Sequence, residues 1–127
     1  MNHVGIVIIS HSEKVTIGIQ EILHEVLPDF PIGIAGGSDD GEIGTSVEKI
    51  MKAIDHVDHG QGTLLFYDLG SAKMNAELVI DMKDTESIKI VEAPLLEGAY
   101  VGAVESNMGK TMDEIIASLN KSFPPLP

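Results

Sequence analysis

The chain has 127 residues, of which 43% are hydrophobic and 22% charged, and its formal net charge is −12. This composition is typical of a soluble globular protein, and we expect residues 1–127 to form a single domain. All eight basic residues are lysines. An acidic chain without arginine is a poor ligand for nucleic acid or for an anionic membrane surface, whereas a partner with a basic face would be attracted to it.

The sequence contains no cysteine, which excludes disulfides, thiol catalysis and thiolate metal ligands. The apolar run at residues 4–9 follows no basic segment and is too short to span a bilayer. The absence of cysteine leaves the compartment open, and the N-terminal pattern makes a cytoplasmic protein the expectation.

Apolar runs that are typical of buried strands alternate along the chain with segments of helical periodicity. The predicted strands are residues 4–9, 32–35, 63–67 and 88–91. Helices are predicted for 13–27, from a cap at Thr45 or Ser46 to about His56, for 72–82, up to Met108 after "EAPLLEG", and from Thr111. This order predicts an α/β fold with an open, mainly parallel sheet of four or more strands and helices on both faces.

Three of the predicted helices have apolar residues with the spacing of one helix face. In the first they are Val15, Ile19, Ile22, Leu23 and Val26, and in the second Val47, Ile50, Met51 and Ile54. In the third they are Ala72, Ala76, Val79 and Ile80, which we expect to face inwards.

Ligands of open parallel sheets bind at the carboxyl ends of the strands. This rule directs attention to residues 10–12, 36–46, 68–71 and 92–98. His11 follows the first strand between Ser10 and Ser12, and histidine is both a nucleophile and a proton carrier near neutral pH. His11 is therefore a candidate nucleophile, although a surface histidine beside a strand end is the plainer interpretation.

Asp68 ends the third strand and is expected on the same rim as His11. A carboxylate that accepts the Nδ1 proton of an imidazole fixes the tautomer and leaves Nε2 as the attacking atom. The alternative is that Asp68 only accepts hydrogen bonds within its own turn.

Gly70, Ser71 and Ala72 begin a predicted helix, whose free N–H groups and positive dipole end are able to bind a phosphate. Ser71 has an alternative role as no more than the helix N-cap. Thr45 and Ser12 are further candidate phosphate-binding residues with hydroxyls near the predicted crevice. Ser12 has an alternative role as a cap of the turn into the first helix.

Other ligand motifs are absent or weak. The loop "GGSDDGEIGTS" lacks the lysine of a phosphate-binding P-loop, the glycine spacing of a dinucleotide site and the pattern of an EF-hand. "DHVDHG", residues 55–60, is better explained as a solvated helix end than as a metal site. We therefore expect neither a metal nor a cofactor.

Four segments together resemble the mannose-type enzyme IIA family of the bacterial phosphotransferase system. They are "SHS" after a strand, "GTS", "DLGSAKMNAE" and "EAPLLEGAYVGAV". Within that family the chain is most similar to the phosphoryl-donor subunits of phosphoenolpyruvate-dependent dihydroxyacetone kinases. The resemblance covers nearly the whole chain, and the third and fourth segments are its specific part.

The resemblance implies a phosphotransferase subunit. His11 would be phosphorylated by the phosphocarrier HPr, Asp68 would orient it, and the backbone at Gly70, Ser71 and Ala72 would face the phosphate. The phosphoryl group would pass to ADP on one kinase subunit, which then phosphorylates dihydroxyacetone on another. The resemblance also implies a homodimer, and a separate HPr, since larger relatives carry fused HPr and enzyme I-like domains.

Two alternatives remain at this point. An enzyme IIA of a mannose-type sugar transporter would use the same residues but donate to a IIB protein, although such relatives tend to have "GGSP" where this chain has "GSAKMNAE". A non-catalytic flavodoxin-like module is less favoured. A receiver domain needs acidic residues where this chain has Ser10, His11 and Ser12, and a flavin binder would be expected to offer more aromatic residues for stacking.

Overall fold

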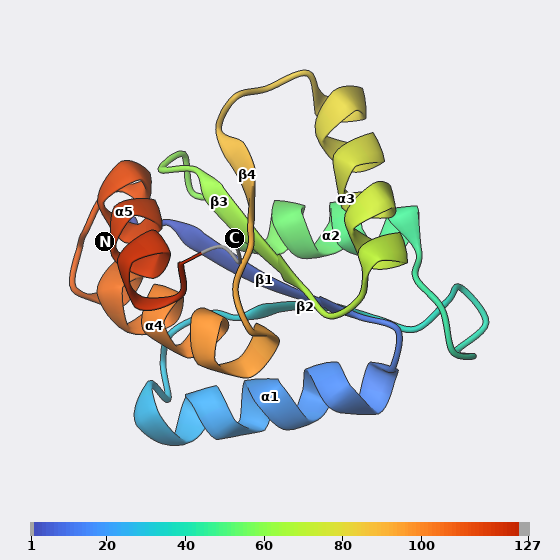
Figure 1. The fold of residues 1–127 in the computed structure, drawn as a ribbon. Helices are drawn as coiled ribbons and strands as arrows, with labels where there is room; N and C mark the ends of the chain where they lie inside the picture. The colour runs from blue at the N-terminus through green and yellow to red at the C-terminus, as the bar shows by residue number, and fades with distance from the viewer. Residues whose placement is uncertain (1, 125–127) are drawn as a thin grey trace.

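The computed structural model describes residues 2–124 and contains four strands and five helices. The strands are β1 (Gly5–Ser10), β2 (Gly33–Gly36), β3 (Thr63–Tyr67) and β4 (Ile88–Val91). The helices are α1 (Glu13–Val26), α2 (Val47–Val57), α3 (Gly70–Lys83), α4 (Leu95–Asn107) and α5 (Met112–Ser122). The strands pair in the order β2-β1-β3-β4, and every pair is parallel. This confirms the predicted fold class (Figure 1).

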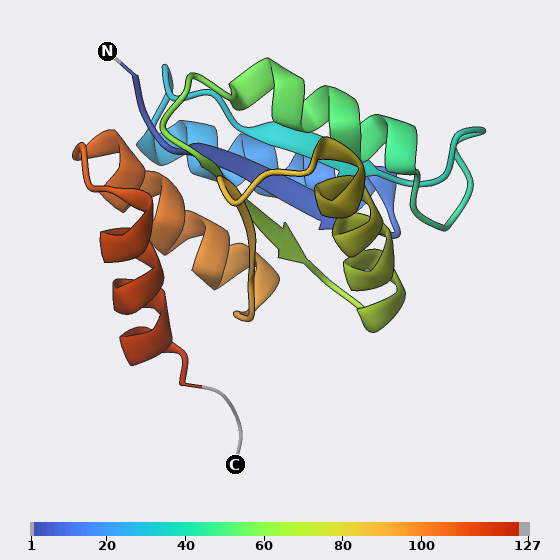
Figure 2. The same cartoon turned by 90° about the horizontal axis from the view of Figure 1, so that it is seen from above.

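Helices cover both faces of the sheet because the side chains of the buried strands alternate between two cores (Figures 1 and 2). Ile6 and Ile8 of β1 lie in one core, together with residues of α1, α4 and α5. Val7 and Ile9 lie in the other, with residues of α2 and α3. The continuous apolar run of β1 is therefore the sequence of a strand buried on both faces.

Helix α1 buries a narrower face than its apolar pattern indicates. Ile19 and Leu23 are in the core, but Val15, Ile22 and Val26 are 43%, 51% and 51% exposed. The helix packs through Thr16, Ile19 and Leu23, so the other three apolar residues lie at the border of that face. Periodicity shows in which direction the apolar face of a helix points. It does not show how much of that face the neighbouring elements cover. In α3, by contrast, the predicted inward face is confirmed: Ala72, Ala76 and Val79 are buried and Ile80 packs against the same core.

Three helices begin at side-chain caps, and one expected cap is wrong. Ser12, Ser46 and Thr111 accept hydrogen bonds from the first turns of α1, α2 and α5. Of the two predicted caps for α2, the structure therefore selects Ser46. Helix α3 begins at Gly70, earlier than predicted, and its N-cap residue is Leu69, which makes no side-chain cap. Ser71 is thus inside the helix and is not its cap.

Gly36 allows the end of β2 to pack directly on the start of α1. A Cβ atom at Gly36 would lie 2.4 Å from Oγ1 of Thr16 and 2.7 Å from Cα of Glu13. Such distances are too short for any side chain. The close approach brings the loop after β2 beside the segment that carries His11, and the N–H of Gly37 donates to the carbonyl of Ser10 at 3.1 Å.

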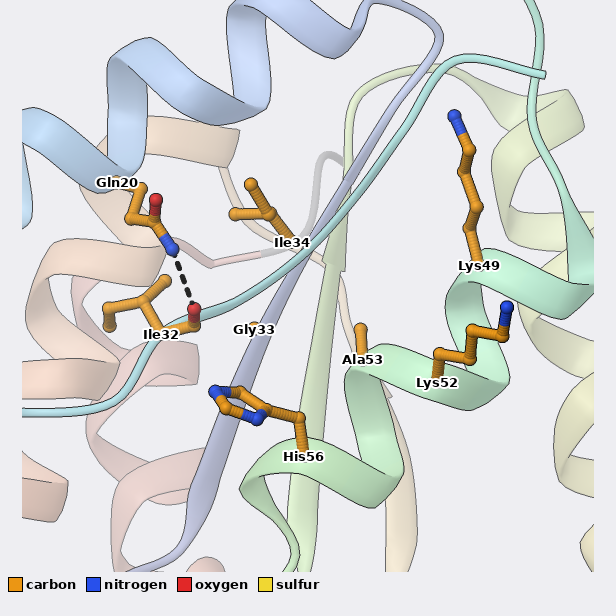
Figure 3. Close-up of a pocket in the computed structure, with 8 residues that line it drawn as sticks. All are labelled: Gln20, Ile32, Gly33, Ile34, Lys49, Lys52, Ala53 and His56. Atoms are coloured by element: carbon orange, nitrogen blue, oxygen red, sulfur yellow. Dashed lines mark hydrogen bonds between the residues drawn. The ribbon is translucent and has the colours of Figure 1, made fainter. Parts of the chain in front are cut away.

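The free edge of β2 is partly occupied by side chains from the flanking helices. Gln20 of α1 donates to the carbonyl of Ile32 at 3.0 Å, and Lys49 of α2 donates to that of Gly36 at 2.9 Å. A hollow of about 360 Å³ lies along this edge between α1 and α2 (Figure 3). Occupied edge carbonyls make pairing with another strand less favourable.

No helix among residues 2–124 is both long enough and apolar enough to cross a membrane.

Candidate functional site

His11 and Asp68 meet because β1 and β3 are adjacent parallel strands that end at the same edge of the sheet. Ile9 pairs with Tyr67, so the residues that follow them lie side by side. The Nδ1 atom of His11 is 3.0 Å from Oδ1 of Asp68, and the backbone N–H of His11 donates to Oδ2 at 3.1 Å. The structure thus brings together the two residues that the strand-end rule placed on one rim.

Asp68 accepts four hydrogen bonds, which occupy both carboxylate oxygens. Besides those from His11, the hydroxyl of Ser10 donates to Oδ2 at 2.7 Å and the N–H of Leu69 donates to Oδ1 at 2.7 Å. Both roles weighed for Asp68 are therefore present, since it bonds its own turn as well as His11. Ser10, to which the sequence assigned no single role, is fully buried behind this carboxylate.

The environment of Asp68 favours its charged form. Partial burial raises the pKa of its carboxyl, but the hydrogen bonds from the His11 ring, the Ser10 hydroxyl and the backbone outweigh burial and hold the pKa below its usual value. An ionised carboxylate only accepts hydrogen bonds. Nδ1 of His11 therefore carries the proton, and in the neutral ring the lone pair is on Nε2.

Ser71 of α3 contacts the other nitrogen of the ring. Its Oγ lies 2.6 Å from Nε2 of His11. Because Nε2 of the neutral ring accepts, the Ser71 hydroxyl is the donor. The imidazole is thus held in line between Asp68 on one side and Ser71 on the other, with its nucleophilic atom directed at the start of α3.

The start of α3 offers free donors for an anion. The helix has no side-chain cap and no acidic residue in its first turn. The N–H of Ala72 donates to the carbonyl of Leu69 at 2.9 Å, whereas within residues 2–124 the N–H groups of Gly70 and Ser71 bond no backbone carbonyl. Open N–H groups at a helix N-terminus bind phosphates well. Gly70 and Ser71 are therefore better placed than Ala72 to offer a backbone N–H.

The loop between β2 and α2 closes a second side of the site. The N–H of Gly44 donates to the carbonyl of His11 at 2.9 Å. The next residue, Thr45, accepts a hydrogen bond from Nδ2 of Asn75 at 2.5 Å. Asn75 lies one helical turn beyond Ser71 and was not among the predicted site residues. Its spacing from Ser71, and its place in the segment "DLGSAKMNAE" that carries the resemblance, are the signals in the sequence that could have identified it.

Ser12 and Glu92 lie at the margins of this group. The hydroxyl of Ser12 accepts from the N–H of Val15 at 3.3 Å as the cap of α1, so its phosphate contact stays a prediction. Glu92, which follows β4, lies 2.5 Å from Nζ of Lys73 and also accepts from the Tyr67 hydroxyl. This pairing engages the lysine nearest to Ser71 in the sequence.

Groups suited to a metal ion do not occur in the part of the chain that the structure describes: no three His, Cys, Asp or Glu side chains cluster there. The hollow of Figure 3 is lined by Lys49, Lys52 and His56 but shares no residue with the site formed by His11, Asp68, Ser71, Thr45 and Asn75, which we call the His11 group. The chemistry that the His11 group supports is the transfer of a group to Nε2, with an oriented imidazole as nucleophile and helix-start donors for an anion.

Comparison with known families agrees with this chemistry. Residues 5–116 match the EIIA-man family, described as the PTS system fructose IIA component. The chain therefore belongs to this family of phosphotransferase-system IIA components.

Individual relatives place the chain more narrowly. It is 44% identical over 115 residues to the phosphoryl donor subunit DhaM of PEP-dependent dihydroxyacetone kinase 1 from Listeria innocua, covering 91% of both chains. It is 40% identical over 117 residues to the phosphotransferase subunit DhaM of the PTS-dependent kinase from Lactococcus lactis, covering 92% of this chain and 94% of that one. The chain belongs to the DhaM family, as the motifs indicated.

A longer relative and two solved structures also match the chain. The DhaM of Escherichia coli is 33% identical over 120 residues, which are 89% of this chain but 25% of that protein. A crystal structure of EF1359, a protein of unknown function, superposes with a TM-score of 0.81 at 32% identity over 95% of both chains. A sigma-54 interaction domain protein from Enterococcus faecalis shares the fold alone, with a TM-score of 0.77 at 13% identity, covering 95% of this chain and 90% of that one.

Proposed function

We propose that this chain is the phosphoryl donor subunit of a phosphoenolpyruvate-dependent dihydroxyacetone kinase and carries the phosphoryl group on Nε2 of His11. The observation that carries the proposal is the line from Asp68 through the ring of His11 to Ser71, with separations of 3.0 and 2.6 Å. The two relatives that match over nearly their whole length are named as the phosphoryl donor or the phosphotransferase subunit of dihydroxyacetone kinases, which supports the kinase over a sugar transporter.

The transfer begins when the Ser71 hydroxyl releases Nε2. The Nε2 lone pair then attacks phosphorus, and the bond between phosphorus and the donor nitrogen of phosphorylated HPr breaks. Nδ1 of His11 keeps its proton, which it donates to ionised Asp68, and this carboxylate stabilises the positive charge that develops on the ring. The Ser71 hydroxyl and the N–H groups of Gly70 and Ser71 then donate to the phosphoryl oxygens. Positioning and charge stabilisation of this kind are the main requirements of phosphoryl transfer.

In the second transfer the bond between Nε2 and phosphorus breaks, and a terminal oxygen of ADP on the kinase subunit takes the phosphoryl group. The His11 ring leaves in its resting tautomer because Nδ1 has kept its proton. We further propose that residues 1–127 act as one domain in the cytoplasm, as a homodimer with a separate HPr. The partners would be the ADP-binding and the dihydroxyacetone-binding subunits.

A labelling experiment tests the proposal. The protein is incubated with labelled phosphoenolpyruvate, enzyme I and HPr, the modified residue is mapped, and the ADP-bearing kinase subunit or a IIB protein is then added. We expect label on His11, no label on His11→Gln, and loss of label to the ADP-bearing subunit. Label on another residue would overturn the role of His11, and loss to the IIB protein alone would favour the transporter function.

A further inference from the structure

We propose that Asn75 is a positioning residue that fixes the hydroxyl of Thr45 as a hydrogen-bond donor to the phosphoryl group on His11. This inference rests on the proposed function and deepens it. It assigns a role to a residue that the sequence did not single out, and it gives Thr45 a defined direction.

The structure links Thr45 to the site through its backbone and to α3 through its side chain. Gly44, the residue before it, donates to the carbonyl of His11 at 2.9 Å. Asn75 donates to Oγ1 of Thr45 at 2.5 Å and lies on the same face of α3 as Ser71, four residues earlier. Three hydrogen bonds, the chain from Gly44 to Thr45 and the first turns of α3 thus connect His11 through Thr45 and Asn75 to Ser71 and back to Nε2.

The direction of the hydrogen bond follows from the chemistry of the amide. The Nδ2 group of Asn75 only donates, so Thr45 is the acceptor in this pair. A threonine hydroxyl has a single proton, and here that proton is not directed at Asn75. It is therefore available to another acceptor, and a phosphoryl group on Nε2 brings three strong acceptor oxygens to the crevice.

Neutral donors matter in this crevice because cationic ones are scarce. The chain has no arginine. Lys73, in the first turn of α3, is paired with Glu92 at 2.5 Å. Hydroxyl and N–H groups are the donors that the structure brings to Nε2 from α3, and the loss of one donor to the phosphoryl group should be measurable.

Reversing the hydrogen bond tests the proposal. Asn75→Asp keeps the shape of the side chain but replaces the donor by an acceptor, so the Thr45 hydroxyl turns to the carboxylate and away from the phosphoryl group. We expect phosphorylation by HPr to slow by about tenfold or more. Thr45→Val should slow it by a similar factor, and Thr45→Ser should recover most of the rate lost in Thr45→Val. Hydrolysis of the phosphohistidine, followed as loss of label, should change in the variants that slow uptake.

The double variant separates this role from a simple effect of charge. In the Thr45→Val background Asn75→Asp should cause little further loss, because no hydroxyl remains to be turned. Asn75→Ala, which removes the donor without adding charge, should be intermediate and serves if Asn75→Asp does not fold. Asn120→Asp places the same charge on α5 and should leave both rates unchanged. Thermal unfolding of each variant checks that it is folded.

Two results would overturn the role of Asn75 while leaving the proposed function intact. In one, Asn75→Asp is labelled on His11 at the wild-type rate. In the other, Asn75→Asp slows labelling by the same factor in the wild-type and the Thr45→Val backgrounds. That result would indicate charge repulsion alone, or a purely structural role of Asn75. Wild-type protein without label on His11 would instead remove both the proposed function and this inference.

Discussion

Helices α5 and α3 begin in opposite ways. At α5 the Thr111 side chain and the Glu114 side chain form a reciprocal capping box, and the first turn contains two acidic residues. At α3 the N-cap is the apolar Leu69, no side chain caps the helix, and no acidic residue lies in the first turn. One helix start satisfies its own donors, and the other leaves them open beside Nε2 of His11.

The two helix starts use their first N–H groups for different purposes: those of α5 stabilise the fold, and those of α3 are free to bind an anion. A cap stabilises a helix because it satisfies N–H groups that have no intrahelical partner. A phosphate makes use of the same N–H groups. The absence of a cap at α3 is therefore expected at a site that receives a phosphoryl group.

The largest expected effect on phosphorylation comes from removing the charge of Asp68, the carboxylate that holds the imidazole of His11 toward the start of α3. Asp68→Asn presents an amide to Nδ1, and an amide donor there would move the ring proton to Nε2, the atom that must attack. We expect the rate of phosphorylation by HPr to fall by about 10²- to 10⁴-fold. The labelling assay measures this rate. A wild-type rate would show that phosphorylation beside the uncapped start of α3 does not require Asp68 to orient the imidazole.

The same variant has a signature in the pH dependence of stability. The pKa of Asp68 in the folded chain lies below its ordinary value of 3.8. Its contribution is therefore present above pH 3.8 and is lost as the pH falls through the lower, folded pKa. Wild-type protein should lose this part of its unfolding free energy in that acid range, and Asp68→Asn should not. Urea unfolding of both proteins across the range checks the sign.

Giving α3 the kind of cap that α5 has should have the next largest effect. Leu69→Asp places a carboxylate where it accepts first-turn N–H groups, and it repels a phosphoryl group. We expect phosphorylation to slow by about tenfold, while the free energy of unfolding stays the same or rises by about 0.5–1 kcal/mol. Leu69→Ala, which removes the apolar side chain without capping, is the matched control. If Leu69→Asp lowered the free energy of unfolding and left phosphorylation unchanged, the contrast between the starts of α3 and α5 would be contradicted.

Removing the cap of α5 should have the smallest effect on transfer. Thr111→Ala should lower the free energy of unfolding by about 1 kcal/mol, because it leaves a first-turn donor without its partner. Phosphorylation of the folded protein should be unchanged. Denaturant unfolding and the labelling assay, measured on the same sample, test both halves of this expectation.

The sequence predicts the parts of this site that depend on local pattern and on strand direction. Apolar runs and breaks locate the strands closely, and two parallel neighbours necessarily end at one edge, which brings His11 beside Asp68. Side-chain pairings across long separations have no local pattern. The contact of Ser71 with Nε2 and that of Asn75 with Thr45 each depend on how α3 is rotated. The exposure of Val15, Ile22 and Val26 likewise depends on the neighbours of α1.

The four hydrogen bonds to Asp68 have a consequence for kinetics. Three of them, from Ser10 and His11, join the end of β1 to that of β3, and the fourth comes from the N–H of Leu69 in the turn of Asp68 itself. Both carboxylate oxygens are engaged, so the carboxylate cannot follow the ring if the ring moves. With Ser71 on the opposite nitrogen, the imidazole is a fixed target. Little reorganisation is then left for this chain during transfer, so we expect the arrival and departure of the partner proteins to set the turnover of the relay.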